Sequence, residues 1–258
     1  MTKHEQHPLS VPGLTNAPRY VGEMIRARHG ERYDWHVHDV GQLAYAASGS
    51  MYVGTPDRVL LLSPAMALWI PPRVEHWMRY GANTEMRYVD VRPDEAESIG
   101  PNCRVMAMTP LLSALITSTI PADDGYRDQA HQQTLYDLLR QELIAATDVP
   151  LSLKLPQDER VRRFAEAALD NPGNIESVEV WLADAPASRK TVERLFVAET
   201  GMSPSRWLRH ARILHAISRL AAGEKVSSVA FDMGYSSSSA FSYMFRHSLG
   251  LSPSDFSA

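Results

Sequence analysis

The stretch that decides the fold is SVAFDMGYSSSSAFSYMFRHSLGLSPS, residues 228–254. Its first part predicts a short helix that ends in a sharp turn, and Ser227, the residue just before the stretch, is the expected N-cap. Ala230 is small enough for two helices to cross closely, and Gly234 can take the positive φ that such a turn needs. The stretch therefore predicts a helix, a tight turn and a second helix.

The second helix, residues 236–246, has one apolar and one polar side. Phe241 and Phe245 lie one turn apart and are expected to be buried. Short polar side chains on a helix that approaches DNA closely suit hydrogen bonds to phosphates and base edges. The predicted DNA-contacting residues of this helix are Ser237, Ser238, Ser239, Ser242, Tyr243 and Arg246.

The end of this stretch has an echo 49 residues earlier in the chain. RLFVAETGMSPSRW starts at Arg194, and YMFRHSLGLSPSDF starts at Tyr243. In both copies a helix ends at a glycine, where a left-handed C-cap is expected, and Ser-Pro starts the next element. The repeat predicts two similar helical units.

The first unit is SVEVWLADAPASRKTVERLF, residues 177–196, with Ser177 and Ser188 as candidate N-caps. Its second helix is expected to bury Val192, Leu195 and Phe196. The predicted DNA-contacting residues there are Ser188, Arg189, Lys190, Thr191, Glu193 and Arg194. The intervening segment predicts a helix of about 18 residues, roughly 27 Å long, which is close to the ~34 Å between successive major-groove faces.

These motifs resemble the DNA-binding domain of the arabinose-regulator (AraC/XylS) family of bacterial transcription factors, and the resemblance covers about residues 158–256. It implies two helix-turn-helix units joined by a long helix, and sequence-specific control of transcription. The first unit departs from the family pattern: Leu182 replaces a small residue and Pro186 replaces the turn glycine. The alternative, a purely structural helical bundle, would not require the repeat, the turn glycines and two polar helices together.

Composition and charge set broad limits on the protein. The chain has 258 residues, 44% of them hydrophobic, and a formal net charge of -4, which suits two soluble domains. Residues 158–258 hold 12 basic and 12 acidic side chains, so the excess of acid belongs to the first 157 residues. The single cysteine, Cys103, excludes a disulfide within the chain, and no signal or membrane segment is visible, so we expect a cytoplasmic protein.

The N-terminal half predicts a small antiparallel barrel. Short apolar or alternating runs, such as GQLAYAAS (residues 41–48) and MALWIPP (residues 66–72), are separated by Pro and Gly turn signals. The expected fold class is α+β, with an N-terminal cupin-like antiparallel β-barrel and a C-terminal all-α domain. The expected domains are an arm over residues 1–18, a sensor barrel over 19–108, helices and linker over 109–157, and the DNA-binding domain over 158–258.

Two histidines, His36 and His38, stand one residue apart in this half, and Gln42 follows. If they lie on one strand, alternation puts all three on one face. This spacing resembles the first motif of the cupin barrel, and WIPPRVEH, which ends at His76, resembles the second, with Arg73 in place of a small turn residue. The resemblance makes His36, His38, Gln42 and His76 candidate metal ligands.

Metal-binding cupins carry a glutamate where this chain has Gln42, and a neutral amide is a poorer ligand for a divalent cation. Three imidazoles still suit Zn, Ni, Cu or Fe. Three interpretations stay open: a divalent transition metal, an organic effector hydrogen-bonded by the histidines, and structural histidines alone. Trp35, Tyr45, Trp69 and Arg87 are candidate lining residues of an effector pocket, and an ordinary barrel core would place them similarly.

A helix is predicted over HQQTLYDLLRQELIAAT, residues 131–147, from its stripe of Leu135, Leu138, Leu139 and Leu143. The stripe fits packing on its own domain or a homodimer seam. TDVPLSLKLPQDE, residues 147–159, is predicted to be a linker. Together the features favour a regulator that binds double-stranded DNA, senses a small molecule and is a candidate to contact RNA polymerase; a metal-dependent cupin oxygenase or isomerase with a helical appendage is the alternative.

Overall fold

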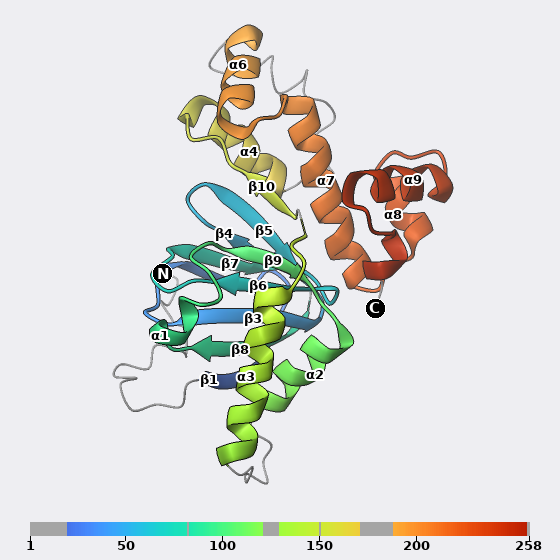
Figure 1. The fold of residues 1–258 in the computed structure, drawn as a ribbon. Coiled ribbons are helices and arrows are strands. Elements are labelled where there is room, and N and C mark those ends of the chain that lie inside the picture. The colour runs from blue at the N-terminus through green and yellow to red at the C-terminus, as the bar shows by residue number, and fades with distance from the viewer. Residues whose placement is uncertain (1–19, 82, 121–128, 150, 171–187, 257–258) are drawn as a thin grey trace. The chain divides into compact units, whose positions relative to one another are not determined.

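The computed structural model describes residues 20–81, 83–120, 129–149, 151–170 and 188–256. The chain forms two compact units (Figure 1). The first contains residues 1–53 and 62–150, and the second contains residues 54–61 and 151–258. The predicted arm over residues 1–18 lies outside the described residues.

The first unit contains two antiparallel sheets, which confirms the predicted cupin-like barrel. One sheet has the strand order β1-β8-β3-β6-β9, and in the other β4, β7 and β2 are neighbours. The strands are β1 (Tyr20–Ala27), β2 (Arg32–His36), β3 (Gly41–Ser48), β4 (Met51–Gly54), β6 (Met66–Ile70), β7 (His76–Tyr80), β8 (Thr84–Val91) and β9 (Arg104–Ala107).

Helices cover one face of the sheet β1-β8-β3-β6-β9, which is the larger of the two sheets within the first unit. α2 (Pro110–Thr119) and α3 (Gln129–Ala145) pack on it (Figure 1), and a short α1 (Pro93–Ala96) follows β8. Leu43 and Tyr45 of β3 belong to the core shared with these helices. Because successive side chains of a strand alternate, Gln42, Ala44 and Ala46 lie on the opposite face.

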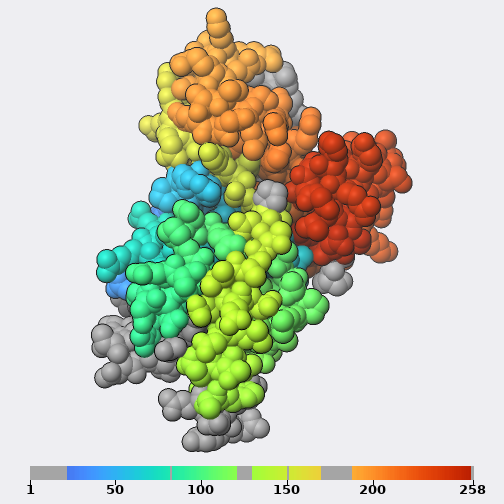
Figure 2. All heavy atoms as spheres, viewed as in Figure 1, coloured from blue at the N-terminus to red at the C-terminus, as the bar shows by residue number. Residues whose placement is uncertain are grey.

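The predicted helix over residues 131–147 corresponds to α3, which shows as a yellow-green band across the surface of the first unit (Figure 2). Leu139 and Leu143 are fully buried in the core of the unit. Leu138 is 37% exposed and Ile144 is 45% exposed. The stripe therefore packs on its own domain, while part of the helix keeps apolar side chains at the surface.

The second unit combines a strand pair with the predicted helices. β10 (Ser152–Lys154) pairs with β5 (Arg58–Leu62) in antiparallel register. The helices are α4 (Glu159–Asp170), α6 (Arg189–Thr200), α7 (Pro204–Ala221), α8 (Val226–Asp232), α9 (Ser238–Leu249) and the 3-10 helix η2 (Pro253–Phe256). No helix in the described parts of the chain is long and apolar enough to cross a bilayer.

The segment predicted to be a linker is partly ordered by contacts within this second unit. The backbone N–H of Leu155 donates to the carbonyl of Asp57 at 2.8 Å. The carbonyl of Pro56 accepts from Gln157 Nε2 at 2.9 Å and from Arg162 Nη1 at 3.2 Å. The second unit therefore starts at residue 151, seven residues before the expected boundary, and it includes a turn from the N-terminal half of the sequence.

The helix ends of the repeat follow the prediction. Gly201 and Gly250 both have φ 74°, the left-handed C-cap that glycine adopts without a Cβ clash. Ser203 caps α7 by accepting from the backbone N–H of Arg206, and Pro204 occupies its first turn. α7 has 18 residues, as expected, and buries Trp207 completely.

Candidate DNA-binding face and histidine cluster

α8 and α9 form the predicted helix, turn and helix. Gly234 has φ 83°, its N–H donates to the carbonyl of Phe231 at 2.9 Å, and Tyr235 N–H donates to that of Ala230 at 3.0 Å. This pair of bonds is a Schellman motif, which ends α8 and turns the chain into α9. Ala230 is 1% exposed, as a close helix crossing requires. The prediction of Ser227 as N-cap was wrong: the N-cap is Lys225, two residues earlier, α8 begins at Val226, and there is no side-chain cap bond.

α9 has its apolar side buried and its polar side exposed. Phe241 and Phe245 are fully buried, as expected. Ser237 caps the helix, because its hydroxyl oxygen accepts from the backbone N–H of Ala240 at 3.1 Å. The remaining predicted contact residues of α9 lie at exposed or half-buried positions: Ser238, Ser239, Ser242, Tyr243 and Arg246.

Tyr243 is the most exposed aromatic residue of α9, at 76%. Its ring stacks on His247 one turn later, with ring planes 7° apart and centroids 6.3 Å apart. An exposed aromatic ring at this place can contact a sugar or the methyl group of a thymine.

α6 offers a second polar helix. The hydroxyl oxygen of Ser188 caps it by accepting from Thr191 N–H at 3.3 Å, which confirms one predicted N-cap. Arg189 and Glu193 form an i,i+4 ion pair at 2.9 Å, and Lys190 and Arg194 are exposed. Val192, Leu195 and Phe196 are buried, as expected. Ser177, Leu182 and Pro186 lie outside the described residues.

The three predicted histidines come together in the first unit, from two strands and a loop. His36 ends β2 and is the register partner of His76, the first residue of β7. His38 lies in the loop that leads to β3. The ring centroids are 4.2 Å apart for His36 and His76, 5.0 Å for His38 and His76, and 6.2 Å for His36 and His38.

Each of these rings is oriented by a bond to a backbone carbonyl. Nδ1 of His36 lies 2.7 Å from the oxygen of Asp34, that of His38 lies 2.8 Å from the oxygen of Val40, and that of His76 lies 2.9 Å from the oxygen of Val74. A carbonyl oxygen can only accept, so Nδ1 carries the proton in each ring. The buried Nε2 atom of a neutral ring is then a lone-pair acceptor.

Burial lowers the pKa of His38 below its ordinary value. The ring is therefore neutral at pH 7, and its Nε2 lone pair is available. That Nε2 atom makes no hydrogen bond to any residue that the structure describes.

Gln42 lies fully buried on the inward face of β3. Its Nε2 donates to Oδ1 of Asp90 on β8 at 3.2 Å, in line with the register of the two strands. Burial raises the pKa of Asp90 to about 6, so this group is a carboxylate near neutral pH and can only accept. The contact turns the amide so that Oε1, which has no partner in the described part of the chain, is a second kind of buried acceptor.

Asp90, the buried partner of Gln42, was not predicted from the sequence. Alternation along β8 puts Thr84, Met86, Tyr88 and Asp90 on one buried face. The sequence signal for Asp90 is a charged residue on the side of the strand where apolar residues are expected to be buried.

The predicted lining residues lie elsewhere. Tyr45 and Trp69 belong to the core beneath α2 and α3, and the indole of Trp69 donates to the carbonyl of Gly100 at 3.0 Å. Both side chains therefore lie on the face of the larger sheet opposite Gln42. Trp35 is 42% exposed. Tyr45 and Trp69 are thus part of the helix-covered core.

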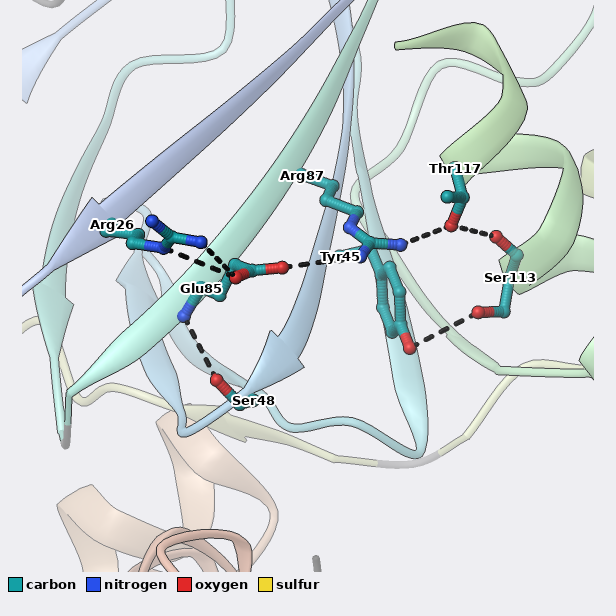
Figure 3. Close-up of polar contacts among 7 residues, drawn as sticks. All are labelled: Arg26, Tyr45, Ser48, Glu85, Arg87, Ser113 and Thr117. Carbon is teal, nitrogen blue, oxygen red and sulfur yellow. Dashed lines mark hydrogen bonds and ion pairs between the residues drawn. The ribbon is translucent and has the colours of Figure 1, made fainter. Parts of the chain in front are cut away.

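Arg87 takes part in a polar network between the larger sheet and α2 (Figure 3). Its guanidinium donates to Thr117 Oγ1 and, at 3.3 Å, to Glu85, which also pairs with Arg26 at 3.4 Å. Tyr45 joins through its hydroxyl, which accepts from Ser113 Oγ at 3.4 Å. The network attaches α2 to the face of the sheet opposite Gln42.

No set of three or more His, Cys, Asp or Glu side chains among the described residues has an arrangement that could hold a metal ion as it stands. The chemistry of the donors, three imidazoles and an amide oxygen, is nevertheless acceptable to a transition metal. A metal would therefore require the rings to move from their present positions.

Two family models match the chain: a helix-turn-helix domain over residues 181–258 and an AraC-like ligand binding domain over residues 20–170. The HTH-type transcriptional regulator NimR of Escherichia coli is 28% identical over 86% of this chain and 81% of its own length. The probable transcriptional regulator LumQ of Photobacterium leiognathi is 26% identical over 86% of this chain and 91% of its own. Among solved structures, ToxT from Vibrio cholerae aligns over 93% of this chain and 98% of its own, with 11% identity and a TM-score of 0.38.

Proposed function

The chain belongs to the AraC family of transcriptional regulators, with an AraC-like ligand-binding domain before a helix-turn-helix domain, and we propose that α6 and α9 are its two DNA-reading helices. The observation that carries this proposal is the pair of capped helices, each with a buried apolar side and an exposed polar side. Gly201 and Gly250 end them in the same way, so the two helices are equivalent parts of a repeat.

The proposal assigns roles to three exposed cations on the two helices. Arg246 contacts phosphate, as do the hydroxyls and backbone N–H groups at the N-terminus of α9, where the helix dipole favours anions. Lys190 and Arg194 reach base edges in the major groove. α7, which follows α6 in the repeat, is the rigid spacer that sets the distance between the two groove segments.

In the first unit, the histidine cluster is the proposed effector site. The buried Nε2 of His38 and Oε1 of Gln42 support this, because buried polar atoms in a folded protein normally have partners and a ligand would supply them. A divalent metal held by His36, His38, Gln42 and His76 is the alternative occupant. The effector would shift the population between two states of the protein that differ in DNA affinity.

We propose that the protein carries out no turnover of its ligand. Its curated relatives are transcriptional regulators, and Gln42 replaces the carboxylate that a metal-dependent cupin enzyme would use. A cytoplasmic location, contact with RNA polymerase and a homodimer are further parts of the proposal. The exposed Leu138 and Ile144 on α3 are the apolar surface from which a dimer seam would be built.

The test of the central proposal is genome-wide mapping of the DNA sites bound by the intact protein. Discrete sites that share a sequence, and that lose occupancy when both Arg194 and Arg246 are replaced by alanine, are the expected result. Binding without discrete sites would contradict it. Metal content and oxygen-dependent turnover of the purified protein test the enzyme alternative in parallel.

A further inference from the structure

The helix α7 concentrates positive charge in a part of the chain that is neutral in total. Residues 158–258 hold 12 basic and 12 acidic side chains, and four of the 12 basic ones, all arginines, lie on α7. The helix also has two histidines, and its sequence contains no aspartate or glutamate. A local basic stripe of this kind is the electrostatic sign of a nucleic-acid partner.

Two of these arginines, Arg206 and Arg209, differ from most other arginines of the second unit. They are exposed, and neither forms an ion pair with any residue that the structure describes. Arg194 and Arg246, which the proposed function already assigns to DNA, share this property. The arginines of the unit that do pair with a carboxylate are Arg58, Arg160, Arg162, Arg163, Arg189 and Arg219.

Arg206 and Arg209 lie one turn apart on the same side of α7. On the opposite side of these turns, Trp207 is fully buried against the rings of Phe164 and Phe196. The two guanidinium groups therefore point away from the aromatic core beside α4 and α6.

This side of α7 lies near the turn that leads into α9. Burial raises the pKa of Tyr235, and the positive charges of Arg209 and Arg212 oppose the rise, so both guanidinium groups lie within electrostatic reach of the phenol. The ring of Tyr235 packs edge-on against Phe241 of α9, with centroids 5.4 Å apart. Arg209 is therefore placed near the beginning of the second proposed reading helix.

We propose that Arg206 and Arg209 bind phosphates of the DNA segment between the two stretches read by α6 and α9, so that α7 is a third DNA-contacting element as well as a spacer. The proposal rests on the proposed function, in which those two helices enter neighbouring groove segments. A guanidinium stays charged, and its planar N–H groups match phosphate oxygens. Such contacts strengthen binding to every sequence and carry no base preference.

The double variant Arg206→Gln/Arg209→Gln removes both charges from exposed positions of the full-length protein. The slope of log affinity against log salt should fall by about two, so that from about 50 to about 200 mM salt the wild type loses roughly tenfold more affinity than the variant. The preferred sequence, selected from a randomised library, should stay the same. An unchanged slope overturns the proposal and leaves an acidic protein surface as the partner of α7.

Two further variants serve as controls. Arg160→Gln/Arg163→Gln removes the same charge from exposed, ion-paired arginines of α4 and should keep the slope. Arg206→Lys/Arg209→Lys keeps the charge and should keep the slope, which a role of the arginines in folding alone would not predict. If the α4 variant loses as much slope as the α7 variant, net charge is the cause and the proposal fails.

Neutral methylphosphonate linkages in the DNA locate the contact. Placed between the two half-sites, they should weaken binding of the wild type and have little effect on Arg206→Gln/Arg209→Gln, because the side chains that would bind those phosphates are gone. Equal weakening of both proteins overturns the location. Discrete genomic sites with an unchanged salt slope contradict this inference alone. The absence of discrete sites contradicts the proposed function, and the slope on a random-sequence duplex then still tests the phosphate contacts of α7.

Discussion

The indole N–H of Trp207 donates to the backbone carbonyl of Lys154 at 2.6 Å. Trp207 is fully buried on α7 and packs against Phe164 of α4 and Phe196 of α6, with ring centroids 6.4 and 5.9 Å away. Lys154 ends strand β10. One side chain therefore attaches the strand to the aromatic core of three helices in the second unit.

Trp207→Phe removes this hydrogen bond and part of the core volume. We expect the free energy of unfolding of the second unit to fall by about 2 kcal/mol, from the missing bond and the cavity together. Differential scanning calorimetry of the full-length protein measures the shift of the corresponding transition. Trp77→Phe, at a half-buried position of the first unit, is the control, and an equal loss in both variants would contradict a specific role for the hydrogen bond.

Arg73 has φ 62°, the left-handed region, and among the described residues it is the non-glycine residue with positive φ. Its N–H donates to the carbonyl of His38 at 2.8 Å, and its guanidinium pairs with Asp39 at 3.2 Å in an exposed ion pair of little net value. The left-handed conformation costs an L-residue about 1–2 kcal/mol, and a glycine at this position would avoid part of that cost.

Arg73→Gly should therefore raise the free energy of unfolding by about 0.5–1 kcal/mol, measured by urea titration. Arg73→Ala is the matched control, because it removes the same ion pair and keeps the Cβ atom. If the alanine variant is stabilised equally, backbone strain is not the cause.

Asp90 makes the stability of the first unit depend on pH. Its pKa is raised from 3.8 to about 6, chiefly by burial. Between these values the folded protein holds a proton that the unfolded chain has released, so stability falls as pH rises through this window and stays low above it. Asp90→Asn removes this loss, which is at most about 3 kcal/mol.

Urea unfolding at pH 4.5 and pH 8 measures the effect. The gain in stability from Asp90→Asn should be clearly larger at pH 8. Asp94→Asn should show no such gain, since Arg92 holds the pKa of that exposed carboxyl below its ordinary value. A gain that is the same at both pH values would show that Asp90 does not titrate in the window.

Arg246 is exposed on the polar side of α9. Arg246→Ala should weaken binding to all DNA sequences and reduce the slope of log affinity against log salt by about one, because the variant neutralises one phosphate fewer. Affinity measured over a series of salt concentrations checks this. Arg26→Ala, an exposed position of the first unit, should keep the slope. An unchanged slope in the Arg246 variant would place the residue away from the phosphates.

Lys190 and Arg194 are exposed on α6. Replacing either by alanine should change which sequence is preferred, because each hydrogen-bonded base edge is worth about 1–3 kcal/mol of discrimination. Selection from a randomised DNA library shows the change in preference. Uniform weakening on all sequences would assign the residue to the phosphates, and unchanged binding would remove it from the interface.

The sequence by itself determined the DNA-binding half to a large extent. The order of caps, turn glycines and buried Phe pairs is local information, because a C-cap at Gly201 or a turn at Gly234 depends on a few neighbouring residues. Ser227 shows the limit: the helix begins at Val226, two residues before the start that a cap at Ser227 would give. The assumption that His36, His38 and Gln42 lie on one strand was wrong, because β2 ends at His36 and Gln42 belongs to β3.

The tertiary structure decided which group meets Gln42. Asp90 lies 48 residues after Gln42 in the sequence and meets it through the register of β3 and β8. Nδ1 of each histidine meets a carbonyl two residues away in the sequence, so the orientation of these rings is a local feature. Tyr45 and Trp69 lie in the helix-covered core. Both faces of β3 and β6 are buried, and alternation alone does not say which of the two faces packs against the helices. Long-range strand pairing, which the spacing of the residues does not encode, fixed the partner of the Gln42 amide.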